Sequence, residues 1–193
     1  MDKTQVNPAR EIRKEFFAFR NGIIADKLRR AGDPHAIIMG CLLVDVSGIA
    51  QRQRQAIGNP ADLKALAQEL WDDTNHRECR LAAPMLYPAD KMSLDLAVEW
   101  CHTVETVEIA DNLCHKLLRH CSQANELFRH LIAQDAPMVK YTGYRLLLNL
   151  LLMGKVVPSE QLQIIVNNEV EQAHGPLTAL LKDIQEEFPN RPT

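Results

Sequence analysis

The sequence predicts an all-α protein, an α-solenoid built from antiparallel helix pairs. Three observations predict this fold class: apolar residues recur at helical spacing, helix-start signals follow one another at short intervals, and one helix pair is repeated along the chain. No segment alternates apolar and polar residues as a half-buried strand does. A length of 193 residues fits one domain, so we expect one folding unit over residues 1–193.

Helix starts are marked by caps and prolines. Asn7-Pro8, Asn59-Pro60 and Gly175-Pro176 each place a capping residue before a proline at the first helical position, where a missing N–H has no cost. Asn75 and Glu78 have the spacing of a capping box. With the leucine periodicity between these signals, the predicted helices cover 8–31 (broken near Asn21-Gly22), 44–57, 60–72, 75–86, 91–104, 107–121, 123–135, 137–153, 159–172 and 176–188.

The longest uncharged runs are short. Ala36–Val44 reads as an extended buried loop, and both this run and Leu146–Gly154 fall far below the roughly 20 apolar residues that cross a bilayer. The first residues, Met1–Gln5, lack the apolar region of a secretory signal. We therefore expect no membrane association and a cytoplasmic location.

Five cysteines form no C-x-x-C pair, which favours a reducing compartment and buried thiols over a disulfide framework. Three of them have a histidine neighbour, as in Cys101-His102, Cys114-His115 and His120-Cys121. Adjacent residues on a helix point about 100° apart, so one ion cannot easily take both side chains of such a pair. We expect no metal site, and no glycine-rich phosphate loop indicates a cofactor.

The net charge of −3 is unevenly distributed. Residues 1–60 carry ten basic and six acidic side chains, whereas residues 61–149 carry nine and thirteen. A basic leading segment can face DNA phosphates, or it can be a solvated helix face, and a sequence pI near 6.2 argues against a strong nucleic-acid binder. The phosphate-facing interpretation assigns DNA contacts to Arg29, Arg30, Arg52 and Arg54.

An internal similarity indicates a repeat architecture. Leu66–Trp71 followed by Leu81–Leu86 matches, at an offset of 61 residues, Leu127–Ile132 followed by Thr142–Leu147. Two helix pairs are expected to separate the copies, which gives a repeat of roughly 30 residues, as in α-solenoids. The alternative is chance similarity between leucine-rich helices.

Several segments together resemble one family. These are Ile37–Leu42, Leu66–Asp72 with His76-Arg77-Glu78, Glu99-Trp100 and Val107–Asp111. They are similar to the HEAT-like alkylpurine DNA glycosylases of the AlkD type over about residues 8–153, whereas the last forty residues match poorly. The resemblance implies a right-handed α-solenoid of HEAT-like (ARM-type) helix pairs, here a single HEAT-like repeat domain over residues 1–193. It also implies a concave basic face that holds double-stranded, alkylated DNA and releases N3- or N7-alkylpurines.

The resemblance assigns roles to particular residues. Asp111 matches the family's catalytic aspartate, and Glu108 matches an acidic residue that follows its first tryptophan. Lys140 matches a basic DNA-contacting position. A carboxylate stabilises positive charge on the sugar, and aromatic faces contact a cationic base.

The active-site pattern also departs from the family. Val107 stands in place of the first tryptophan and Tyr141 in place of a DNA-contacting arginine, and no late aromatic counterpart is evident. If aromatic contacts contribute about 1–2 kcal/mol each, the loss of two lowers the rate roughly 10²- to 10³-fold. We therefore expect weak or lost glycosylase activity.

Two hypotheses remain open from the sequence. One is a DNA alkylation repair protein that binds duplex DNA and hydrolyses N-glycosidic bonds weakly. The other is a non-catalytic HEAT-like scaffold that binds a protein or structured DNA, since the acidic middle and C-terminal parts are poorly suited to phosphates.

Overall fold

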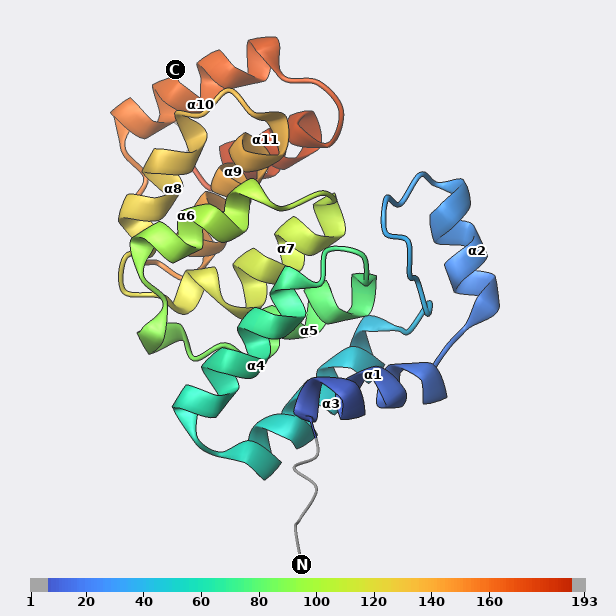
Figure 1. Cartoon of the computed structure of the whole chain (residues 1–193). Helices are drawn as coiled ribbons and strands as arrows, with labels where there is room; N and C mark the ends of the chain where they lie inside the picture. The colour runs from blue at the N-terminus through green and yellow to red at the C-terminus, as the bar shows by residue number, and fades with distance from the viewer. Residues whose placement is uncertain (1–6, 189–193) are drawn as a thin grey trace, which may run out of the picture. The chain divides into compact units, whose positions relative to one another are not determined.

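The structure, a computed structural model, describes residues 7–188 and is helical throughout (Figure 1). These residues form eleven α-helices and two short 3₁₀ helices, and no strand occurs among them. A single bridge between Ile37 and His76 is the nearest approach to sheet pairing in this part of the chain. The prediction of an all-α protein is confirmed, and the packed helix pairs described below are consistent with a HEAT-like α-solenoid. No helix among the described residues is both long and apolar enough to span a bilayer.

The helices cluster into two compact units, Met1–Lys91 and Met92–Thr193, and each is described by itself. The prediction of a single domain over residues 1–193 stays a prediction. Unit 1 contains α1 (Pro8–Ala18), α2 (Gly22–Arg30), α3 (Leu43–Ile57), α4 (Pro60–Asp72), α5 (Arg77–Leu86) and the 3₁₀ helix η1 (Ala89–Lys91). Unit 2 contains α6 (Leu94–His102), α7 (Val107–Lys116), the 3₁₀ helix η2 (Leu118–His120), α8 (Ala124–Ile132), α9 (Pro137–Leu152), α10 (Glu160–Gln172) and α11 (Pro176–Glu186).

Asparagine caps start three helices of unit 1. The side chains of Asn7, Asn21 and Asn59 accept hydrogen bonds from the first free backbone N–H groups of α1, α2 and α4. The predicted break near Asn21-Gly22 and the predicted starts at Pro8 and Pro60 are therefore confirmed.

A buried carboxylate fixes the loop that precedes α3. Glu78 is fully buried and accepts hydrogen bonds from the backbone N–H groups of Met39, Gly40 and Cys41 at 3.1, 3.0 and 3.3 Å. Arg77 Nη1 donates to the same carboxylate at 2.9 Å. The predicted capping box of Asn75 with Glu78 is wrong: α5 begins at Arg77, its N-cap residue makes no side-chain cap, and the Glu78 carboxylate binds a distant loop instead.

The repeated segments form two packed helix pairs. α4 packs against α5 in unit 1, and α8 packs against α9 in unit 2. The connections are short, residues 73–76 and 133–136, so each pair is antiparallel. Along the chain, α6 and α7 are the α-helices that lie between the two pairs, together with the short 3₁₀ helices η1 and η2. The sequence predicted two helix pairs between the copies, and the structure has one.

Gly143 allows the second pair to pack closely. A Cβ atom at this position would lie 2.8 Å from Leu131 Cβ and 2.9 Å from the backbone N of Ile132. Only a hydrogen fits there, so α8 can approach the middle of α9. This contact sets the position of α9, which carries Lys140, Tyr141, Tyr144 and Arg145 of the site described next.

Candidate functional site around Asp111

Helix α7 presents Asp111 at the surface of unit 2. Thr106 caps the helix by accepting a hydrogen bond from Ile109 N at 3.3 Å. Ile109 and Ala110 are buried, whereas the side chain of Asp111 is 37% exposed. Val107 precedes Asp111 by four residues and lies on the same face of α7. The carboxylate is thus anchored on a buried helix and remains open to solvent.

Two side chains of α9 contact this carboxylate. The Tyr141 hydroxyl donates to Asp111 Oδ1 at 2.9 Å, and Arg145 Nε lies 3.2 Å from the same oxygen as an ion pair outside hydrogen-bond geometry. Tyr141 and Arg145 are four residues apart, so both face α7. Among the described residues, none donates a hydrogen bond to Asp111 Oδ2, and it is the atom that a ligand can meet.

Tyr141 acts in this arrangement as a proton donor. Burial, followed by the negative charge of Asp111 and the hydrogen bond to it, raises the pKa of Tyr141 well above its ordinary value of 10. The phenol therefore stays protonated across the physiological pH range. It holds Oδ1 without adding charge to the site.

A cavity of about 270 Å³ lies beside this cluster within unit 2. Residues of α7, α9, α10 and α11 and of the segments before α9 and α11 line it: Val107, Asp135, Pro137, Met138, Lys140, Tyr141, Glu169, Gln172, Ala173, His174, Pro176 and Leu177. Tyr141 belongs to both places, because its side chain lines the cavity and its hydroxyl binds Asp111. The volume is near the lower end of the range for small-molecule sites.

Lys140 faces a carboxylate across this cavity. Its Nζ lies 3.1 Å from Glu169 Oε1 and 3.3 Å from Glu169 Oε2. Tyr144, which is buried in α9, also lies within electrostatic reach of Glu169. Burial and the charge of Glu169 raise the pKa of Tyr144 well above its ordinary value, so this phenol stays protonated.

The site contains no clear metal-binding group. No cluster of three or more His, Cys, Asp or Glu side chains that could hold a metal ion occurs among residues 7–188. All five cysteines are buried and free of disulfides. Burial raises the pKa of Cys114, behind the site, well above its ordinary value, which disfavours the thiolate that binds metals.

Comparison with protein-family models assigns the chain. The model described as DNA alkylation repair enzyme matches residues 12–163, more than three quarters of the sequence. The chain belongs to the DNA alkylation repair enzyme family. No curated protein and no solved structure matched the chain.

The family match covers part of the site. Asp111, Lys140, Tyr141 and Arg145 lie within the matched residues, whereas Glu169 lies beyond position 163. The suspected relationship to this DNA alkylation repair family is therefore confirmed. The wall that α10 and α11 add to the cavity falls outside what the family pattern accounts for.

The predicted DNA-contacting residues occupy both units. In unit 2, Tyr141 is bonded to Asp111, Lys140 is paired with Glu169, and Glu108 is half-buried in the first turn of α7. The four predicted arginines all lie in unit 1, Arg29 and Arg30 on α2 and Arg52 and Arg54 on α3.

Most of these arginines already have intramolecular partners. Arg29 binds Asp26 at 3.1 Å and the carbonyl oxygen of Ile38 at 3.2 Å. Arg52 binds Glu15 at 2.6 Å. The other two differ from each other: Arg54 donates to the carbonyl oxygen of Met85 at 3.1 Å, and Arg30 is exposed without a partner among the described residues.

Sequence reasoning missed two residues of the site, Arg145 and Glu169. The spacing of four residues from Tyr141 could have indicated Arg145, because it places both side chains on one face of a helix. No comparable signal exists for Glu169, which reaches Lys140 from α10 only through tertiary packing.

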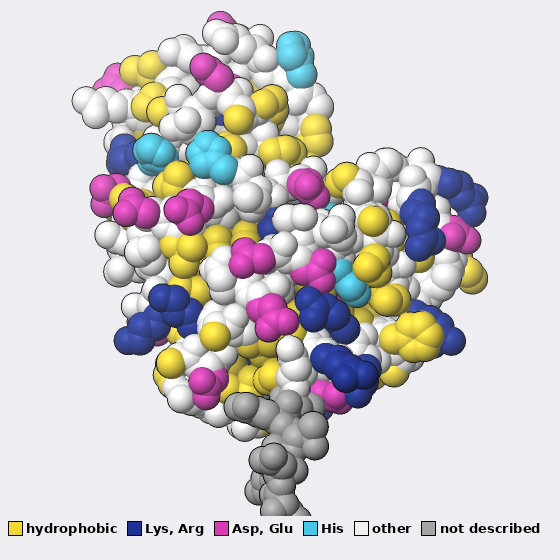
Figure 2. Space-filling view, viewed as in Figure 1, with side chains coloured by type: hydrophobic (Ala, Val, Ile, Leu, Met, Phe, Trp, Pro, Cys, Tyr) yellow, Lys and Arg dark blue, Asp and Glu magenta, His cyan; other side chains and the backbone are white. Residues whose placement is uncertain are grey.

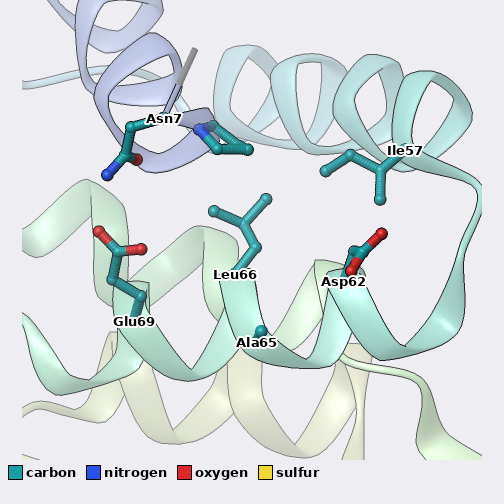
Figure 3. Close-up of a pocket in the computed structure, with 7 residues that line it drawn as sticks. Asn7, Ile57, Asp62, Ala65, Leu66 and Glu69 are labelled. Atoms are coloured by element: carbon teal, nitrogen blue, oxygen red, sulfur yellow. The ribbon is translucent and has the colours of Figure 1, made fainter. Parts of the chain in front are cut away.

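A second, larger cavity lies in unit 1 and has a different character. It encloses about 590 Å³, and its described lining is Asn7, Pro8, Ile57, Asp62, Ala65, Leu66 and Glu69. Figure 3 shows Leu66 between the two carboxylates, Asp62 and Glu69, on α4, with Ile57 facing them from α3. Among the described residues the lining has two carboxylates and no basic side chain, a poor match for a DNA phosphate.

Proposed function

We propose that this protein binds alkylated double-stranded DNA and, with low efficiency, hydrolyses the N-glycosidic bond of N3- or N7-alkylpurines at Asp111. The observation that carries the proposal is the Asp111 carboxylate, held through Oδ1 by Tyr141 and Arg145, with Oδ2 open to solvent. Membership of the DNA alkylation repair enzyme family supports a repair-type function.

The chemistry requires only charge stabilisation. An N3- or N7-alkylpurine is cationic, so the electron pair of the C1′–N9 bond leaves with the base, which departs neutral. Positive charge develops on the sugar, and Asp111 Oδ2 stabilises it. Water then forms the new C1′–O bond and loses a proton to solvent. No cofactor takes part in this sequence.

Low efficiency follows from the residues around the carboxylate. Arg145 places a positive charge 3.2 Å from Oδ1, which weakens the negative field that reaches the sugar. Val107 provides no aromatic face for a cationic base, and Tyr141 contributes one aromatic ring at the edge of the cavity.

The decisive experiment measures release of 7-methylguanine and 3-methyladenine from alkylated duplex DNA. Asp111→Asn keeps the shape of the side chain but removes its charge, and we expect release to fall at least about 10²-fold. Asp183→Asn is the matched control, because Asp183 is exposed on α11 in the same unit and has no partner among the described residues. Release that is equal in the two variants contradicts a role for Asp111.

A non-catalytic scaffold that binds a protein or structured DNA is the second candidate. It is favoured by the pairing of Arg29, Arg52 and Lys140 with carboxylates, which leaves few cations for phosphates. Basic and acidic side chains are also interspersed on the face seen in Figure 2. Salt dependence separates the candidates, because affinity that rests on several phosphate contacts falls steeply between about 50 and 200 mM salt. If the protein neither releases alkylated bases nor binds duplex DNA at low salt, the repair function is ruled out.

A further inference from the structure

The Lys140–Glu169 pair occupies the cavity beside Asp111. Only 22% of the Lys140 side chain and 20% of the Glu169 side chain are exposed. Both carboxylate oxygens approach Nζ, at 3.1 and 3.3 Å, which is how two oxygens of a phosphate would approach the same ammonium group. The cation that sequence reasoning assigned to DNA is therefore already satisfied within the protein.

Glu169 also faces the buried side of α9, where its charge acts on the Tyr144 phenol. Val166, one turn earlier on α10, is fully buried and anchors the helix. A DNA phosphate can bind Lys140 only by displacing this carboxylate.

The ionisable groups that line the cavity disfavour a phosphate. Asp135 and Glu169 are acidic, Lys140 is the one lysine or arginine among the described lining residues, and His174 lies on the segment before α11. With Lys140 neutralised by Glu169, an anion entering the cavity meets Asp135 without a compensating charge. An uncharged or cationic group meets no such repulsion.

We propose that Glu169 is a specificity-determining residue of this site, which pairs with Lys140 and thereby excludes DNA phosphates from the cavity beside Asp111. The cavity is reserved for an uncharged or cationic group, such as an alkylated base, while the DNA backbone binds elsewhere. This inference rests on the proposed function, because it concerns DNA bound at the same site. Glu169 lies beyond the residues that the family model matches, in the second half of α10.

The test compares Glu169→Gln with Glu171→Gln. Both substitutions remove one negative charge from α10, and Glu171 is exposed without a partner among the described residues, so it controls for net charge. Glutamine at 169 is isosteric with glutamate, so the shape of the side chain is kept. The measurement is the affinity for unmodified duplex DNA as a function of salt concentration, with thermal unfolding of each variant as the check on folding.

Releasing Lys140 adds one phosphate contact. We therefore expect the slope of log K against log salt to steepen by about 0.9 in Glu169→Gln and to be unchanged in Glu171→Gln. Between about 50 and 200 mM salt, Glu169→Gln then loses roughly 3.5-fold more affinity than the control. The double variant Lys140→Gln/Glu169→Gln returns to the slope of the control, because no cation remains at that position.

Each result has one meaning. Equal slopes for Glu169→Gln and Glu171→Gln, in a protein that binds duplex DNA, overturn the role of Glu169 and leave the proposed function intact. A steeper slope that persists in the double variant also overturns it, because the gain would not involve Lys140. If none of the variants binds duplex DNA at low salt, the proposed function and this inference both fail.

Discussion

Two glycines within helices are expected to respond in opposite ways to the same substitution. In α9, a Cβ at Gly143 would lie 2.8 Å from Leu131 Cβ and 2.9 Å from both Ile132 Cγ2 and Ile132 N. In α3, a Cβ at Gly48 would meet only Arg52 Nη1, at an ordinary 3.6 Å. Gly143→Ala therefore creates steric overlap with backbone atoms, whereas Gly48→Ala does not.

The magnitudes follow from these distances. Alanine in a helix is favoured over glycine by roughly 0.5–1 kcal/mol, and this is the whole effect expected at Gly48. At Gly143 the overlap with α8 costs about 1–3 kcal/mol, which exceeds that gain. With a shift of about 2–4 °C per kcal/mol for a protein of this size, Gly48→Ala raises the Tm by about 1–4 °C and Gly143→Ala lowers it by several degrees.

Thermal and urea unfolding followed by circular dichroism measure both changes. Gly143 lies between Tyr141 and Arg145 on α9, so a displaced helix also weakens their contacts with Asp111. We expect base release to fall in Gly143→Ala and to be unchanged in Gly48→Ala. If Gly143→Ala stabilises the protein as much as Gly48→Ala does, the inference that α8 packs too closely on Gly143 to admit a Cβ atom is wrong.

Two further predictions concern buried ionisable groups of unit 1. Glu78→Ala removes the acceptor of three backbone N–H groups and of buried Arg77. It should lower the free energy of unfolding, measured in urea, by about 3–5 kcal/mol. The control Glu99→Ala, at an exposed residue, should lower it by less than about 0.5 kcal/mol. Burial lowers the pKa of His76 from its ordinary 6.5, so as the pH falls the unfolded chain binds a proton at this residue before the folded protein does. The contribution of His76 to the free energy of unfolding is therefore complete above about pH 6.5 and decreases as the pH drops below it. His76→Leu should flatten the difference in urea midpoint between pH 7.5 and 5.5, and an unchanged difference would assign the pH dependence to other groups.

The local parts of the fold could be predicted from the sequence. Asn7 and Asn59 cap helices in the predicted way, because a capping side chain binds N–H groups two or three residues away. Glu78 has the spacing of a capping box, yet its carboxylate binds N–H groups 37 to 39 residues earlier in the chain. A spacing rule cannot weigh a local partner against a distant one, so this prediction failed.

The site shows the same division. Asp111 and Tyr141 could each be named from the sequence. Their hydrogen bond joins two residues that are 30 positions apart and depends on how α7 packs on α9. Lys140 could be named as a DNA contact from the family pattern, whereas its partner Glu169 lies in the part of α10 that the pattern does not cover. Residue types were predictable, and the pairs that modify their charges were not.

These pairs change the expected electrostatics of the site. Asp111 faces Arg145 and Lys140 faces Glu169, so two of the charges that the family resemblance assigned to function have an opposite charge within 3.2 Å. Arg145 has two opposing effects on Asp111: its positive charge orients the carboxylate, and it also reduces the negative field available to a sugar cation. Because Arg145 and Tyr141 both contact Oδ1, the opposing charge is farther from Oδ2, the oxygen left open to a ligand. A carboxylate bound in this way retains part of its stabilising effect, which is the basis of the weak catalysis that we propose.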